Sequence, residues 1–135
     1  MITRRNEMKL CNFSDENELI FNENKELYKK AIFFDLEHYV YRKPVCVGVF
    51  GCCYYDSIKN AIEVTQYMIE GKKDVKNILK LAKEYFENAY RTGEKKYIIT
   101  FSGNNDFTVI NYLFEKYDVD FDIKEYFQSI DLQRE

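Results

Sequence analysis

The stretch that most constrains the fold is Ala31-Ile-Phe-Phe-Asp-Leu-Glu37, where an apolar run leads directly into two acids. Ala31–Phe34 has the length and composition of a buried strand. Because side chains alternate across a strand, Asp35 and Glu37 are expected on one face, roughly 7 Å apart along it. Two neighbouring carboxylates repel each other unless a cation compensates, and a hard cation such as Mg²⁺ prefers their oxygens. The stretch predicts a strand that ends in a metal site. The alternative interpretation is that both acids lie in a solvated loop at the strand end.

The composition indicates one globular domain. The chain has 135 residues, of which 46% are hydrophobic and 17% aromatic, enough for a core and too apolar for a disordered chain. Its net charge of −3 excludes a surface coated for non-specific nucleic-acid binding. Local binding of phosphates through a metal ion or a lysine patch stays open.

Cysteine spacing and hydropathy predict the cellular compartment of the protein. Cys11, Cys46, Cys52 and Cys53 form no Cys-x-x-Cys pair, which favours buried reduced thiols over a zinc site. The N-terminus resembles no signal peptide, and no apolar run approaches the length of a membrane span. These features predict a cytoplasmic protein with no membrane partner.

The remaining elements follow from hydrophobic periodicity and turn residues. Residues 1–30 read as an N-terminal extension that adds an edge strand and a short helix near residues 23–30, and residues 31–135 as the domain itself. Asp74 is a suitable N-cap for the first helix, Gly93 a suitable stop, and Gly48 and Gly51 suggest a bulge or a close backbone approach. The pattern predicts strands over 45–55 and 61–69, a helix from 75, a strand over 96–101, a helix after 106 and a strand over 128–132.

This order predicts an α/β fold with a mixed five-stranded sheet. Residues 45–55 and 61–69 form an antiparallel hairpin, later strands add in parallel, and helices pack on the faces. Ala31–Glu37 is expected at the centre, with residues 45–55 antiparallel to it.

Three features together resemble the ribonuclease H-like fold and, within it, the DEDD 3′-to-5′ exonuclease superfamily. They are Asp35-x-Glu37 at the end of a strand, the hairpin after it, and Ser102-Gly-Asn-Asn-Asp106-Phe107 between a strand and a helix. The resemblance covers residues 31–132. Asp35 and Glu37 match the family's first motif, and Asp106 matches its third carboxylate. Family members usually place phenylalanine before that aspartate, whereas Phe107 follows it here, so Asn105 is the alternative position.

The resemblance implies a two-metal mechanism with Mg²⁺ or Mn²⁺ held by Asp35, Glu37 and Asp106, and a DNA or RNA substrate cleaved from its 3′ end. The family's last motif, an aspartate on a helix near a His or Tyr, is not present in this sequence. Asp131 is a candidate additional ligand, although it also reads as a plain acid at a strand end. His38 does not match the family's histidine base and is expected in a loop. We therefore expect weak cleavage or none from these 135 residues.

Other function classes remain open. The fold could serve as a non-catalytic module that binds nucleic acid or protein. A phosphatase-type enzyme, with an aspartate as phosphoryl acceptor, fits less well because that class favours aspartate where Glu37 stands and has an all-parallel sheet. A purely structural protein leaves the three placed acids without an explanation.

Overall fold

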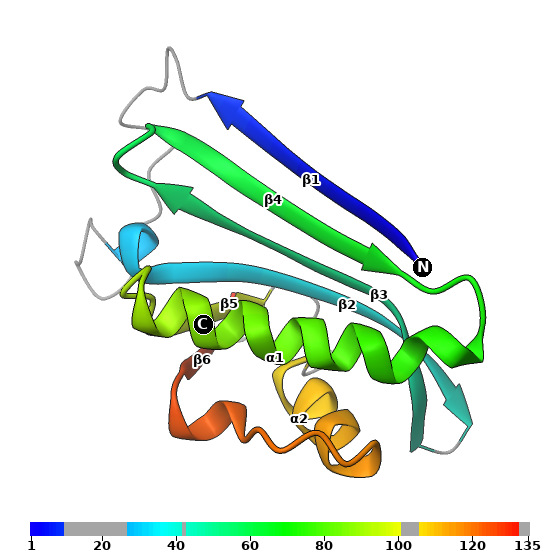
Figure 1. Cartoon of the computed structure of the whole chain (residues 1–135). Helices are drawn as coiled ribbons and strands as arrows, with labels where there is room; N and C mark the ends of the chain where they lie inside the picture. The colour runs from blue at the N-terminus through cyan, green and yellow to red at the C-terminus, as the bar shows by residue number, and fades with distance from the viewer. Residues whose placement is uncertain (10–26, 42, 101–105, 133–135) are drawn as a thin grey trace.

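The described residues form a six-stranded mixed sheet in the order β1-β4-β3-β2-β5-β6 (Figure 1). The computed structural model describes residues 1–9, 27–41, 43–100 and 106–132. Strands β1 to β4 pair antiparallel, whereas β5 and β6 add parallel to β2. The elements are β1 (Ile2–Lys9), η2 (Leu27–Lys30), β2 (Ala31–Tyr41), β3 (Lys43–Asp56), β4 (Ala61–Met68), η3 (Lys72–Asp74), α1 (Val75–Arg91), β5 (Tyr97–Thr100), α2 (Asp106–Lys116), η4 (Ile123–Glu125) and β6 (Gln128–Asp131).

Strand β2, which contains the acid-tipped stretch, lies between β3 and β5 as predicted. The sheet has one strand more than the five predicted for the domain, and the additional strand is the edge strand expected from the N-terminal extension. Ile2–Lys9 forms β1, an edge strand that pairs with β4 over its whole length. Of the short helix expected near residues 23–30, Leu27–Lys30 forms a 3-10 turn, and residues 23–26 lie outside the described residues. The sequence of β1 is polar from Thr3 to Glu7 and apolar only at Ile2 and Met8, which suits an edge position and carries little hydrophobic signal.

The antiparallel pair formed by β2 and β3 is longer than predicted and contains a bulge. β2 continues to Tyr41, so His38 lies within a strand rather than a loop, because β-prone residues such as Tyr39 and Val40 follow it. Glu37 pairs with Val49 but His38 pairs with Val47, which leaves Gly48 as the extra residue. This confirms the bulge that Gly48 suggested.

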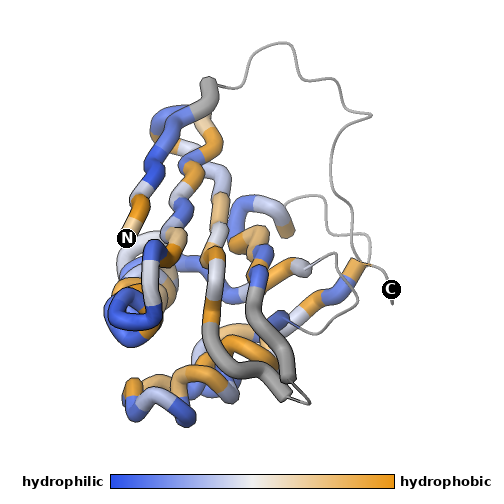
Figure 2. The backbone as a smooth tube through the Cα atoms, turned by 90° about the vertical axis from the view of Figure 1, so that its right-hand side faces the viewer, coloured by the Kyte–Doolittle hydropathy of each residue, from blue (hydrophilic) through white to orange (hydrophobic). Residues whose placement is uncertain are grey.

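Both helices pack on the same face of the sheet. Ile32, Phe34 and Leu36 of β2 join the apolar stripes of α1 and α2 in one core. Alternate residues of β2 face the other side, where Ala31 and Phe33 pack in a smaller cluster around β5 and β6. Hydrophobic and hydrophilic positions accordingly alternate along the strands (Figure 2).

Residues just before and just after α1 determine where the helix begins and ends. Asp74 precedes the helix as predicted but does not cap it. Its carboxylate instead accepts a hydrogen bond from the Glu70 N–H at 2.9 Å and pairs with the N-terminal ammonium group at 3.0 Å. At the other end, a Cβ on Gly93 would lie 2.8 Å from the carbonyl oxygen of Ala89. Glycine is therefore required where the helix stops, as predicted.

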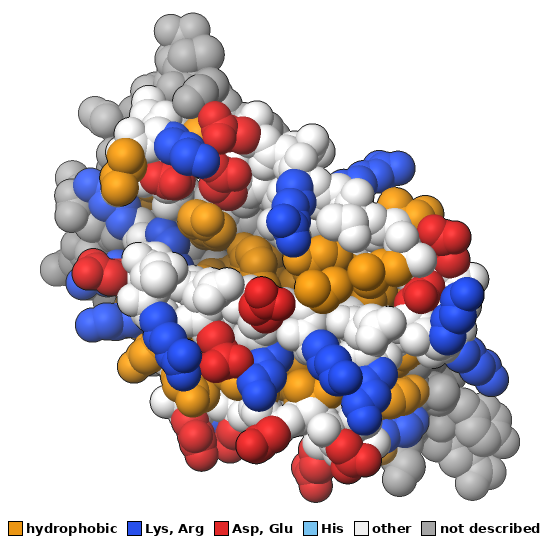
Figure 3. Space-filling model, viewed as in Figure 1, with side chains coloured by type: hydrophobic (Ala, Val, Ile, Leu, Met, Phe, Trp, Pro, Cys, Tyr) orange, Lys and Arg blue, Asp and Glu red, His pale blue; other side chains and the backbone are white. Residues whose placement is uncertain are grey.

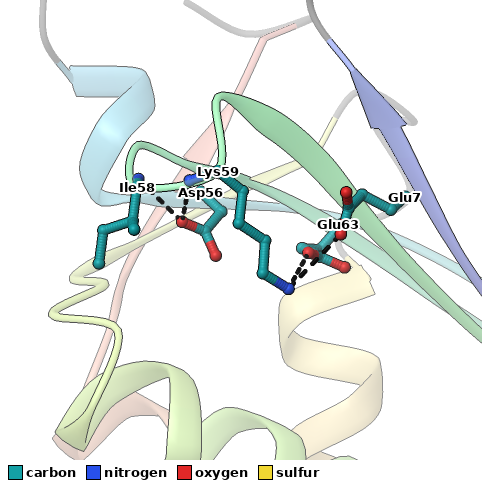
Figure 4. A network of polar contacts seen from close by, with 5 residues as sticks. All are labelled: Glu7, Asp56, Ile58, Lys59 and Glu63. Atoms are coloured by element: carbon teal, nitrogen blue, oxygen red, sulfur yellow. Dashed lines mark hydrogen bonds and ion pairs between the residues drawn. The ribbon is translucent and has the colours of Figure 1, made fainter.

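The turn between β3 and β4 also holds the edge strand. Oδ1 of Asp56 accepts hydrogen bonds from the N–H groups of Ile58 and Lys59, which lets a 96% exposed isoleucine sit in a turn. The Lys59 ammonium group pairs with Glu63 of β4 at 3.1 Å and with Glu7 of β1 at 3.4 Å (Figure 4). One lysine thus bridges two neighbouring strands.

Two further sequence predictions concern thiols and membranes. Cys52 and Cys53 are free, and burial raises the pKa of both thiols. Cys11 lies outside the described residues, as does the side chain of Cys46. None of the helices in the described ranges is long and apolar enough to cross a membrane.

Candidate active site

The two acids of β2 lie where the strand loses one of its neighbours. β5 pairs with β2 only at residues 31–33, whereas β3 continues beside β2 past Glu37. Beyond the β5 pairing, the backbone N–H of Leu36 donates a hydrogen bond to Oδ2 of Asp106, with N···O 3.2 Å. An acid from another element is thus held against β2 at the residue between Asp35 and Glu37.

Asp106 reaches this position because it is the first residue of α2. Phe107 and Ile110 anchor the helix in the core on the face that also buries Leu36. The side chain of Asp106 is almost completely inaccessible, with 1% of the residue exposed. The positive end of the helix macrodipole favours a carboxylate at this position. The sequence prediction of an acid at the helix start is confirmed.

Asp35 and Glu37 differ from Asp106 in their surroundings. Both are exposed, whereas Leu36 between them is buried, so the two acids share the face of β2 that points away from the helices. Within the described residues, neither carboxylate forms a hydrogen bond or an ion pair. Their oxygens are accessible to a ligand from solvent.

One glycine of β3 lies across from Asp35, and a second lies next to the register partner of Glu37. Gly51 is the register partner of Asp35. The register partner of Glu37 is Val49, and the bulge residue Gly48 comes immediately before Val49 in the chain. A hollow of about 440 Å³ lies beside Asp35, lined in part by Phe33, Gly51 and Ile99. The sequence predicts a bulge or a close backbone approach at both glycines, and only the strand register brings them near the acids.

The structure does not bring the other predicted site residues to the acids of β2. Asp131 ends β6, two strands away from β2, and pairs with Thr100 of β5. Its neighbour Ile130 packs in the cluster on the open face, so strand alternation turns Asp131 toward the opposite face from Asp35. Asn105 lies outside the described residues, as does the side chain of His38.

The donor chemistry of the site suits a hard divalent cation, because carboxylate oxygens are the ligands that Mg²⁺ and Mn²⁺ prefer. In the described part of the chain, however, no group of three or more His, Cys, Asp or Glu side chains is arranged to hold a metal ion. Asp106 is held at the strand of Asp35 and Glu37, but the three carboxylates do not form a ready-made cage. Their joint role in metal binding stays a prediction.

The fold and the position of the acids agree with the comparison to protein families. A family model described as RNase_H superfamily matches residues 32–135. The chain belongs to the RNase H superfamily. This confirms the predicted ribonuclease H-like fold, with β2 as its central acid-bearing strand. Comparison with curated proteins and with solved structures gives no match. Membership of the superfamily indicates a nuclease-type domain that binds nucleic acid, and such nucleases generally use divalent metal ions.

The contact between Asp106 and β2 makes a prediction about stability. Replacing Asp106 by Ala leaves the buried N–H of Leu36 without its acceptor, and we expect the free energy of unfolding to fall by about 1–3 kcal/mol. Asp106→Asn keeps an oxygen acceptor and should cost clearly less. Urea unfolding monitored by circular dichroism measures both. Asp120→Ala, at an exposed position, is the matched control, and an Asp106→Ala variant as stable as this control would contradict the contact.

Proposed function

We propose that this RNase H superfamily domain is a metal-dependent nuclease of the DEDD exonuclease type, which hydrolyses phosphodiester bonds of DNA or RNA from the 3′ end. The observation that carries the proposal is the hydrogen bond from the Leu36 N–H to the Asp106 carboxylate. It holds an acid from a helix start against the backbone of the central strand, at the residue between the two exposed acids, whose side chains point to the opposite face.

Each acid has a distinct task in this proposal. Asp35 and Glu37 are accessible and would supply the oxygens that hold Mg²⁺ or Mn²⁺ near the substrate phosphate. Asp106 is fixed by Leu36, so its orientation is set before substrate binds. Bound divalent cations supply Lewis-acid activation of the phosphate and of the attacking water in nucleases with two metal ions. The hollow beside Asp35 and Gly51 provides space for the terminal nucleotide.

The expected activity is weak. The exonuclease type that the sequence resembles uses four acids and a general base, and Asp131 faces away from Asp35. Three acids without an assigned base lower the rate, because general bases contribute typically 10²–10⁴-fold. A second candidate function, a non-catalytic module that binds nucleic acid, is favoured by the lack of a three-acid metal cage within the described residues.

A cleavage assay separates these functions. The purified chain is incubated with 5′-end-labelled single-stranded DNA or RNA in Mn²⁺, and then with a chelator in excess. We expect slow shortening from the 3′ end that stops when the chelator is added. Binding without any shortening would support the non-catalytic module, and shortening that ignores the chelator would exclude a metal-dependent mechanism.

A further inference from the structure

Helix α1 carries a row of lysines on the side that faces away from the core. Because residues three or four apart lie on the same side of a helix, the spacing of these lysines places them about one turn apart. Figure 3 shows lysine and arginine side chains one after another along α1. Residues 75–83 contain no acid. The lysine row, as we name it, consists of Lys72 and Lys73 just before the helix and of Lys76, Lys80 and Lys83 within it; all are exposed except Lys83, which is half-buried.

Neighbouring acids do not neutralise the lysine row. Among the described residues, none of its five ammonium groups forms an ion pair or a hydrogen bond. Asp74, next to the start of the row, is 7% exposed and pairs with the N-terminal ammonium group at 3.0 Å. Glu84 and Glu87 follow the row along the helix, and Glu87 pairs with Arg91 at 3.3 Å. The row therefore concentrates positive charge on a chain whose net charge is −3.

The row begins at the end of the sheet where the acids of β2 lie. β4 ends at Met68, whose register partner is Val49, and Val49 in turn pairs with Glu37. The three residues lie side by side across the sheet, so Met68 is two strand spacings, roughly 10 Å, from Glu37. Lys72 comes shortly after Met68 in the chain and opens the row. A nucleic-acid strand held at Glu37 thus has a short path around this end of the sheet to the lysine row.

The length and chemistry of the row suit a phosphate backbone. The stretch from Lys73 to Lys83 is roughly 15 Å long at about 1.5 Å per residue. A nucleic-acid strand carries one negative charge about every 3.4 Å, so the row spans about four phosphates. Lysine ammonium groups bind phosphate oxygens as point charges and do not read bases. An anionic membrane fits less well, because a helix that binds lipid inserts its apolar side, and the apolar stripe of α1 is buried in the core.

We propose, on the basis of the proposed nuclease function, that the lysine row is a nucleic-acid interface. It holds the phosphate backbone of the substrate beyond the part that is cleaved at the acids of β2. Binding at this surface is independent of base sequence, because the contacts are to phosphates. It also weakens steeply with salt, because each contact between an ammonium group and a phosphate releases counterions from the nucleic acid.

The test measures binding of the full chain to a fluorescent single-stranded oligothymidylate by anisotropy, at several salt concentrations and with a chelator in excess. Neither metal ions nor cleavage contribute under these conditions. Replacing Lys76, Lys80 and Lys83 together by Gln should weaken binding about 10- to 100-fold in 0.1 M salt. The slope of log affinity against log salt concentration should become shallower by about 2, because each phosphate contact on a single strand contributes about 0.7.

Two further triple variants are the matched controls. Replacing Lys96, Lys116 and Lys124 by Gln removes the same net charge at exposed positions elsewhere and should leave binding as in the parent chain. Arginine at the three substituted positions of the row keeps the charge and should keep the salt slope. All variants should unfold in urea at the midpoint of the parent, because none of the six side chains is buried.

The outcomes separate the lysine row from the nuclease activity. No binding of the oligonucleotide by the parent chain, an unchanged affinity and slope in the Gln variant of the row, or equal losses in the two Gln variants would overturn the interface. Tighter binding to phosphatidylserine vesicles than to the oligonucleotide at equal phosphate concentration would assign the row to a membrane and overturn it as well. Binding through the row without cleavage in Mn²⁺ would contradict the nuclease alone.

Discussion

Replacement of Phe86 by Ala is expected to lower the free energy of unfolding by about 3–5 kcal/mol. Phe86 of α1 is completely buried. Its ring centre lies 5.5 Å from that of Phe50, 5.8 Å from that of Phe34 and 5.8 Å from that of Phe127. One side chain therefore joins α1 to β2, β3 and the segment before β6. Truncation leaves a cavity that rigid neighbouring rings fill poorly.

Urea unfolding measures this loss, and two variants calibrate it. Phe86→Leu keeps most of the volume and should cost roughly 1.5 kcal/mol. Lys80→Ala, on the exposed side of the same helix, should change stability by no more than about 0.5 kcal/mol. A loss below about 1 kcal/mol for Phe86→Ala would mean that α1 does not pack on β2 and β3 as described.

The fold could be predicted largely because hydrophobic periodicity reports burial. The helix from residue 75 and the central position of Ala31–Glu37 both follow from which side chains avoid water. The edge strand β1 was expected only as part of an N-terminal extension. Its residues from Thr3 to Glu7 are all polar. The position of the strand depends on pairing with β4 and on the ion pair between Lys59 and Glu7, neither of which is visible in a local sequence pattern.

The residues of the candidate site could be predicted from the sequence, but their arrangement in space could not. Motif resemblance identified Asp106, but the hydrogen bond from Leu36 depends on where β5 stops pairing with β2, a tertiary property. The side chain of Asp131 points to the face of the sheet opposite Asp35, and this too follows from the register of β6 with β5.

The second large effect concerns activity. Replacing both Asp35 and Glu37 by Ala should abolish metal-dependent cleavage, because the exposed oxygens that would hold the cation are gone. Both side chains are exposed, so the free energy of unfolding should stay within about 0.5 kcal/mol of the parent or rise as two like charges are removed. Asp120→Ala together with Glu115→Ala removes two exposed acids elsewhere and should leave cleavage unchanged. Cleavage that survives in the Asp35 and Glu37 double variant would assign it to another site.

The most direct test of the account is to map where Mn²⁺ binds, by paramagnetic broadening of amide signals in the ¹⁵N-labelled chain. We predict that Mn²⁺ selectively broadens the signals of Asp35, Leu36, Glu37 and Asp106, that Mg²⁺ in excess restores them, and that the double Ala variant shows no such broadening. Broadening that is confined to the other acidic surfaces, or that persists unchanged in the double variant, would contradict a metal site on the central strand.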